Sequence, residues 1–195
     1  MFYGIEIPVS NGKWGKVYRK SLGSINLKDE YAQESMNRLF EEYDFLCEQI
    51  AKQEKLIKKL SQTEKYRDRL EILQSIPGIG LITGMEILLE LQDLSRFKRA
   101  DQIAAYVGLT PSQYSSSDKI RMGRITKVGK SNIRALLVES SWILITKDEA
   151  MKIRYDKLKV RVGGKRAIVA IARSLIIRIR RMLLDNRQYV VGLVT

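Results

Sequence analysis

Residues 73–91, LQSIPGIGLITGMEILLEL, contain the pattern that decides the fold of this chain. Two apolar helical runs flank a Pro-Gly-x-Gly turn, in which Pro77 starts the turn and Gly78 and Gly80 permit positive φ angles. This order is typical of a helix-hairpin-helix motif, whose backbone N–H groups at the start of the second helix can hold a phosphate without reading sequence. The alternative is an αα-corner whose glycines serve only packing. The sequence therefore predicts two packed helices, with Gly78 and Gly80 as candidate phosphate contacts.

The chain is strongly basic. Its 195 residues include 35 Lys and Arg against 22 Asp and Glu, a formal net charge of +13. Such a surface attracts polyanions, so nucleic acid is the first partner to consider and an anionic membrane surface the second. No apolar run reaches the roughly 18–20 residues of a membrane span, and residues 1–10 lack the pattern of a secretory signal. We therefore expect a cytoplasmic, nucleoid-associated protein without a membrane partner, and the single Cys47 fits a reducing compartment.

The chain contains no histidine, which excludes Ser-His-Asp triads, histidine bases and ordinary zinc sites. Any catalysis must therefore use hydroxyls, carboxylates and cations. Glu86 and Glu90 lie one helical turn apart and could share a divalent ion, but such pairs are more often solvated. We therefore expect no metal ligand and no cofactor bound by this chain alone.

A basic segment at residues 104–134 is the strongest candidate for chemistry. Three hydroxyls, at residues 115–117, precede a series of cations spaced two or three apart and interrupted by glycine: Lys119, Arg121, Arg124, Lys127 and Lys130. Cations neutralise the oxygens of a phosphodiester, and a serine oxygen can attack phosphorus when the developing charge is stabilised. The alternative is a solvated Ser/Gly loop that happens to be basic. We expect these cations to contact nucleic acid.

Residues 28–64 predict one long coiled-coil-like helix. They contain no Gly or Pro, and apolar residues follow a heptad repeat over four heptads, interrupted only by Gln53. The two seam positions are Met36, Tyr43, Ile50 and Ile57, and Leu39, Leu46, Gln53 and Leu60. The alternative is an amphipathic helix packed on its own domain. A coiled coil here would make the chain a homo-oligomer.

The remaining segments complete a mainly α-helical fold. Residues 1–27 alternate loosely and are broken by glycine and proline, which predicts a short irregular or β-like arm. Residues 65–195 read as a helical domain. Its last helix, 165–184, has an apolar face and an arginine-rich face without an acid before Asp185, which favours contact of Arg173 and Arg180 with DNA or RNA.

Three blocks in order resemble a known family: LQSIPGIGLITGMEIL, RFKRADQIAAYVGLTPSQYSS and GRITKVGKSNIRALLVESS. They are similar to the C-terminal transposase domain of the Piv-related insertion-sequence transposases, the DEDD recombinases that a bridge RNA guides. The resemblance covers about residues 66–184, and that family also has a coiled coil where residues 28–62 stand. It implies DNA as a partner, a guide RNA as a further partner, and an assembly of several chains.

The resemblance implies a serine nucleophile just after the G-L-x-P block, which forms a transient phosphoserine link to the cut DNA strand. That position falls on Ser116, with Ser115 as the alternative. Ser117 and Asp118 stand where the family commonly has glycine. Arg124, Lys127 and Arg134 match the basic block of the family. The resemblance implies that these cations hold phosphates in the transition state.

The family's N-terminal RuvC-like domain, with four acidic metal ligands, has no counterpart in this sequence. Only Tyr3–Ile7 faintly resemble its first strand, with Glu6 where an aspartate would stand. We therefore expect the serine-bearing part of a recombinase, with Mg²⁺ held by an acidic domain in trans. The alternatives are a non-catalytic module that binds DNA or a guide RNA, acting beside a full-length relative, and a helical adaptor whose charge is incidental.

Overall fold

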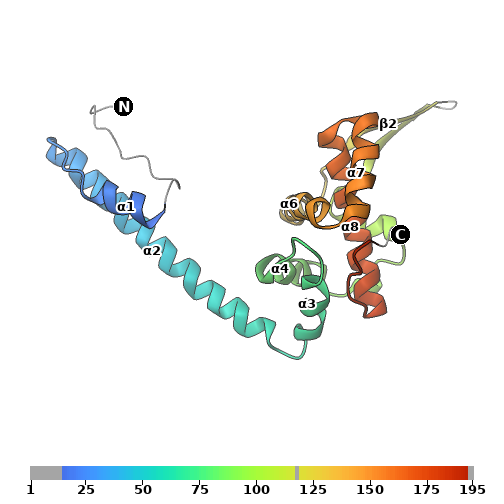
Figure 1. Ribbon diagram of the computed structural model, residues 1–195, viewed down its shortest axis with the longest axis horizontal. Coiled ribbons are helices and arrows are strands. Elements are labelled where there is room, and N and C mark those ends of the chain that lie inside the picture. The colour runs from blue at the N-terminus through green and yellow to red at the C-terminus, as the bar shows by residue number, and fades with distance from the viewer. Residues whose placement is uncertain (1–14, 117–118, 193–195) are drawn as a thin grey trace. The chain divides into compact units, whose positions relative to one another are not determined.

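The computed structural model describes residues 15–116 and 119–192, and the side chains of Lys16, residues 113–116, residues 119–122 and Arg124 are outside that description. Within these residues the fold is mainly α-helical, as predicted, and the chain divides into two compact units, one up to Gln53 and one from Glu54 onward (Figure 1).

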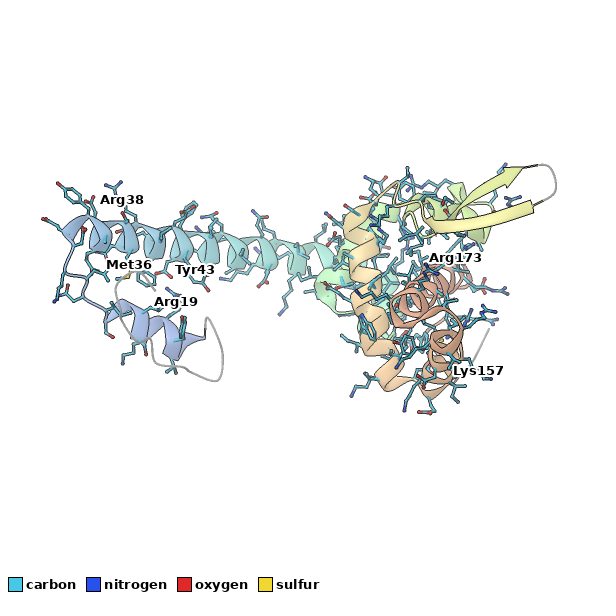
Figure 2. All side chains as sticks on the ribbon, turned by 90° about the horizontal axis from the view of Figure 1, so that it is seen from above. Arg19, Met36, Arg38, Tyr43, Lys157 and Arg173 are labelled. Atoms are coloured by element: carbon cyan, nitrogen blue, oxygen red, sulfur yellow. The ribbon has the colours of Figure 1, made fainter. Side chains whose placement is uncertain are left out.

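The first unit contains α1 (Lys16–Gly23) and most of α2 (Glu30–Ser61). The predicted irregular or β-like arm is wrong for Lys16–Gly23, which form a helix, and residues 1–14 lie outside the described part of the chain. Tertiary contact explains the helix: the Arg19 guanidinium forms an ion pair with Asp44 and lies 4.6 Å from the centre of the Tyr43 ring (Figure 2). A segment of eight residues is too short to be a stable helix without such packing.

The long helix α2 confirms the predicted helix at residues 28–64, although its role as a coiled coil stays a prediction. Met36 and Tyr43 are partly buried, whereas Leu39 and Leu46 on the other seam position are 66% and 50% exposed. The second seam position therefore has no apolar partner among the described residues of this chain.

The second unit is built around α8 (Gly164–Asp185), which contacts four other helices. Its buried side chains recur every three or four residues, as expected for a helix with one face in the core. The helices around it are α3 (Arg67–Gln74), α5 (Ala100–Tyr106), α6 (Ser131–Lys147) and α7 (Glu149–Val162). A further helix, α4 (Leu81–Leu91), packs on α3 and α6, and a short 3-10 turn, Leu94–Arg96, follows it.

The predicted serine loop is in fact a β-hairpin. Strand β1 (Pro111–Ser116) pairs antiparallel with β2 (Lys119–Ile125), and the ribbon runs outward from the helices of its unit (Figure 1). Lys119 and Arg121 in β2 are two residues apart, which is the period of a strand. Only the charge of these residues was considered in the sequence analysis, and this spacing was not used. The hydroxyl-rich segment therefore has a defined backbone register.

The chain after α8 folds back onto the helices. Asn186 adopts a left-handed conformation that ends α8, and Tyr189 is then buried, with its backbone N–H donating to Ser75 Oγ at 2.8 Å. The tail thereby ties the α3–α4 turn to the C-terminal helix. None of the helices in the described residues is both long and apolar enough to cross a bilayer.

Candidate nucleic-acid interface

The hairpin gives the candidate nucleophiles distinct positions. Ser116 stands opposite Lys119 at the end of β1, whereas Ser115 stands opposite Ile120. Tyr114 stands opposite Arg121. The side chains of these residues and of Arg124 lie outside the described ones, so the register of the backbone is what the structure supplies here.

Two glycines hold the base of the hairpin against the segment before it. Gly108 has φ +72° and Gly129 has φ +106°, both in the region that favours glycine. A Cβ on Gly129 would lie 2.1 Å from the Tyr106 carbonyl oxygen, and one on Gly108 would lie 2.4 Å from the Val128 oxygen. The return segment can therefore cross residues 106–109 only because both positions lack a side chain.

Arg134 reinforces this crossing. Its Nη1 donates to the Val107 carbonyl oxygen at 2.9 Å, and the side chain is partly buried. A Cβ on Gly108 would also meet this nitrogen, at 2.7 Å. Arg134 therefore fixes the backbone beneath the hairpin through this bond, and its contact with a phosphate stays a prediction.

Lys130 is likewise committed to a contact within the protein. Its Nζ lies 3.0 Å from Glu90 Oε1, which also accepts a hydrogen bond from the Tyr106 hydroxyl at 2.5 Å. The hydrogen bonds from Tyr106 and Lys130 lower the pKa of Glu90, and the bond to Glu90 raises the pKa of Lys130. The pair with Glu90 anchors the return segment of the hairpin on α4, and the contact of Lys130 with a phosphate stays a prediction.

The contacts of Glu90 with Tyr106 and Lys130 are relevant to the possibility that Glu86 and Glu90 share a divalent ion. Across residues 15–116 and 119–192, no three Asp, Glu, Cys or His side chains gather as a metal site would require. Among the described residues, the Glu90 carboxylate is contacted by Tyr106 and Lys130 and is not part of a cluster of acids.

Lys127 differs from its neighbours because its side chain is exposed and has no hydrogen bond or ion pair within the described residues. It adopts a left-handed conformation, φ +56°, where the chain leaves the hairpin. The adjacent Val128 is 74% exposed. Lys127 is therefore a cation displayed at the foot of the hairpin.

The two glycines of the Pro-Gly-x-Gly turn have different roles. Gly78 has the predicted positive φ, +94°, and a Cβ there would lie 2.8 Å from the Ser140 carbonyl oxygen and 2.9 Å from Ile143 Cβ. The prediction of a positive φ at Gly80 is wrong: its φ is −94°, and nothing lies within 4 Å of a Cβ placed on it. Gly78 thus serves the packing of the turn on α6, and Gly80 begins α4 at an open surface.

The two arginines predicted on the last helix also differ. Arg180 donates from Nε and Nη2 to the Phe97 carbonyl oxygen, at 2.9 and 2.5 Å, and from Nη2 to the Lys98 oxygen at 3.2 Å. It therefore ties α8 to the segment before α5, and its contact with nucleic acid stays a prediction. Arg173 is partly exposed on α8 and makes no such bond among the described residues (Figure 2).

A buried polar network between α7, α8 and the tail was missed by the sequence analysis. Asp148 is fully buried and accepts hydrogen bonds from the Ala150 and Met151 amides and, at 2.5 Å, from the Tyr189 hydroxyl. Burial raises the pKa of Asp148, but its hydrogen bonds outweigh burial and leave the pKa lowered. Asp148 follows an apolar helix and precedes Glu149, a helix-start signal that could have identified it, whereas nothing local marks Tyr189.

Comparisons with known proteins point to one family. Residues 70–156 match the model of the transposase IS116/IS110/IS902 family. The chain is similar to the transposase for insertion sequence element IS1111A of Coxiella burnetii, with 31% identity over 118 residues that cover 58% of this chain and 32% of that protein. It is also similar to the transposase for insertion sequence element IS1328 of Yersinia enterocolitica, with 33% identity over 114 residues that cover 58% of this chain and 33% of that protein. The chain therefore spans about a third of the length of these relatives.

Proposed function

We propose that this chain is the DNA-binding and serine-bearing part of a transposase of the IS116/IS110/IS902 family. The observation that carries the proposal is the family match over residues 70–156, which includes the whole hairpin and therefore Ser116. The net charge of +13 supports a polyanionic partner. A protein acting on DNA in this way would work at the bacterial nucleoid.

Ser116 is the proposed nucleophile. Residues that stand opposite each other in an antiparallel pair share a face of the ribbon, and side chains alternate between faces. Ser116 stands opposite Lys119 in the pairing of the two strands, whereas Ser115 stands opposite Ile120. The register of the backbone supports Ser116 over Ser115, because the residue paired with Ser116 is a cation.

The proposed reaction is a transesterification. A bond forms between Ser116 Oγ and the phosphorus of a DNA phosphodiester, and the bond from phosphorus to one strand oxygen breaks. The serine proton passes to a carboxylate of an acidic domain, and the departing oxygen takes up a proton to become a free hydroxyl. Lys119 and Arg121 would stabilise the charge that develops on the phosphate.

The acidic domain belongs to the proposal because the described residues lack a cluster suited to a metal ion. Such a domain, in a longer polypeptide or in a second chain, would hold Mg²⁺ and supply the carboxylates. Bound there, the ion would act as a Lewis acid toward the phosphate. This chain would itself contribute the serine nucleophile, the basic side chains near it and the binding of the nucleic-acid strand.

The grip on nucleic acid would involve the residues that the fold leaves exposed. Lys127 at the foot of the hairpin and Arg173 on α8 are available cations. The first amides of α4 have no carbonyl partner within the helix, and nothing lies within 4 Å of a Cβ placed on Gly80 before them, which supports a phosphate contact here. A guide RNA is a second candidate ligand for the same cations.

A non-catalytic nucleic-acid-binding module is the second candidate function. The observation that favours it is the absence of a cluster of metal-binding side chains from the described residues. Such a chain would keep the scaffold of the family and bind DNA or RNA beside a full-length relative.

A trapping assay distinguishes the two functions. The full chain would be incubated with nicked element-end DNA and Mg²⁺, with and without a full-length relative, and run on a denaturing gel. We expect a covalent adduct in the presence of the relative that Ser116→Ala abolishes and Ser115→Ala keeps, with DNA affinity changed less than about twofold, because the serine bonds only during reaction. A salt-sensitive mobility shift without any adduct would establish the binding module and contradict the catalytic role.

A further inference from the structure

A pocket of about 280 Å³ lies between α6, α7 and α8, away from the hairpin residues discussed above. Its floor is apolar and formed by Leu144, Met151 and Leu175, which are 1%, 3% and 1% exposed. Its polar lining comes from the two helices on either side: Arg154 of α7, and Ser174, Arg178 and Arg181 of α8. Three guanidinium groups above an apolar floor suit a ligand that is anionic at one end and apolar at the other.

The charge around the pocket is strongly positive. Helix α7 carries five Lys and Arg against two acids, and α8 carries six against one. Arg154 is partly buried and has no hydrogen bond or ion pair among the described residues. Arg181 pairs with Asp185 at 3.2 Å, but its side chain is 80% exposed, and exposed pairs of this kind exchange readily with a stronger anion.

Arg178 is held in position by the buried network. Its Nη1 donates to the Tyr189 hydroxyl at 3.0 Å, and its guanidinium lies 4.2 Å from the centre of the Tyr189 ring. The Tyr189 hydroxyl in turn donates to the buried Asp148. This chain of bonds fixes the guanidinium at the pocket, and a fixed donor loses less conformational entropy on binding than a mobile one.

We propose that this pocket holds one nucleotide unit of a single-stranded nucleic acid, with its phosphate at Arg154, Arg178 and Arg181. Its base or sugar would cover the floor formed by Leu144, Met151 and Leu175. A base inside a duplex must be unstacked and unpaired before it can enter a pocket, at a cost in free energy, whereas an unpaired strand can present a base without that cost. The volume is close to the lower end of small-ligand sites, about 300 Å³, which fits one nucleotide unit. The inference rests on the proposed function only in naming nucleic acid as the partner.

Binding of the full chain to a labelled single-stranded dT₁₂ and to a blunt 12-base-pair duplex, measured by fluorescence anisotropy at fixed salt, tests the pocket. We expect Arg154→Gln to weaken dT₁₂ binding by about tenfold and duplex binding by less than about twofold, since a charge-assisted bond within the pocket is lost. The matched control is Lys159→Gln, which removes one charge from an exposed position about 140° around the same helix. The proposal would be overturned if Arg154→Gln and Lys159→Gln lost the same affinity for dT₁₂, or if Arg154→Gln lost as much affinity for the duplex as for dT₁₂. Either result would indicate non-specific electrostatic attraction.

A second variant fills the pocket without removing charge. Ser174→Leu should weaken dT₁₂ binding while leaving the circular dichroism spectrum and melting temperature unchanged, because Ser174 is partly exposed and, among the described residues, its side chain donates only to the Ala170 carbonyl oxygen. Retained dT₁₂ affinity in a folded Ser174→Leu protein would contradict the proposal. Binding of dT₁₂ needs neither a full-length relative nor a covalent adduct, so failure of the trapping assay and failure of the pocket are distinguishable.

Competition identifies the source of the anionic group. Thymidine monophosphate should displace dT₁₂ more effectively than inorganic phosphate at equal ionic strength, because only the nucleotide covers the apolar floor. Equal competition by the two would reduce the site to a phosphate site, and stronger competition by polyglutamate would indicate an acidic peptide. Either result would overturn the nucleotide assignment.

Discussion

Lys130 Nζ lies 3.0 Å from Glu90 Oε1, and this pair joins the return segment of the hairpin to α4. Tyr106 completes the cluster from α5 through its hydroxyl, 2.5 Å from the same carboxylate. Three elements that are distant in sequence thus meet at one carboxylate. The hairpin that carries Ser116 is therefore positioned from its base by contacts within the protein.

Replacing Glu90 should loosen this base. We expect Glu90→Gln to lower stability by about 1 kcal/mol, because it weakens one hydrogen bond and removes an ion pair, and to lower the melting temperature by about 2–4 °C. Glu86→Gln, one turn earlier on α4, is the control, since Glu86 has no such partner within the described residues. Calorimetric melting of both variants checks the prediction, and equal melting temperatures would remove Glu90 from the anchoring role.

The same carboxylate predicts an acid dependence of stability. The pKa of Glu90 is lowered in the folded protein from its ordinary value of 4.5, so the folded state favours the ionised form. Its contribution is therefore fully present above pH 4.5 and is lost as the pH falls through the lowered folded pKa. Urea unfolding should show stability falling in this range, and Glu90→Gln should show a shallower fall. An identical pH profile in both proteins would contradict the assignment.

The close contact between the segment that contains Gly129 and residues 106–109 makes a second prediction about stability. Gly129→Ala should destabilise the second unit by about 2 kcal/mol or more, because the new Cβ meets the Tyr106 carbonyl oxygen and the backbone has a positive φ. Gly80→Ala is the matched control, with φ −94° and open space around the added carbon, and should cost well under about 1 kcal/mol. Urea unfolding curves of the two variants give both values, and equal costs would mean that the segments are not in contact.

Variants of Lys127 and Arg134 should affect different properties: the first should change DNA binding and the second the stability of the fold. Lys127→Gln should reduce the log–log salt dependence of DNA binding by about 1, as expected for the loss of one phosphate contact, without changing the melting temperature. Arg134→Gln should lower the melting temperature, because the bond from its guanidinium to the Val107 carbonyl oxygen is lost. A salt slope unchanged in Lys127→Gln would place that side chain away from the nucleic acid.

The exposed seam of α2 predicts self-association. We expect the chain to sediment as a dimer or larger at micromolar concentration, and a Leu39→Glu, Leu46→Glu double variant to sediment as a monomer, because charges at core positions of a coiled coil are costly. Lys55→Glu, outside the two seam positions, should leave the association state unchanged. A strictly monomeric wild type would exclude the coiled coil.

Most of the helices were predictable because each one has a local signal. The Pro-Gly-x-Gly turn, the heptad repeat of α2 and the apolar face of α8 all follow from spacing along the chain. The helix α1 was missed because its stability comes from contact with Asp44 and Tyr43, twenty-odd residues away. The hairpin was missed because the series of cations at residues 119–130 was interpreted as a basic loop, and the two-residue spacing of Lys119 and Arg121 was not interpreted as a strand.

The candidate site was predictable only in part, because composition does not show what a cation is bonded to. Arg134 donates to a carbonyl 27 residues away, and Arg180 to one 83 residues away. No local pattern marks such bonds, so both arginines were assigned to nucleic acid. Lys127 and Arg173 remain compatible with that assignment because the fold leaves them exposed.

The most direct test of the proposed chemistry is to locate the covalent link itself. Adducts trapped on nicked element-end DNA in the presence of Mg²⁺ and a full-length relative would be digested with nuclease and protease, and the modified peptide sequenced by tandem mass spectrometry, with the relative isotopically labelled to distinguish the two chains. Our account predicts a nucleotide remnant on Ser116 of this chain. A remnant on Ser115, or on the relative alone, would contradict it.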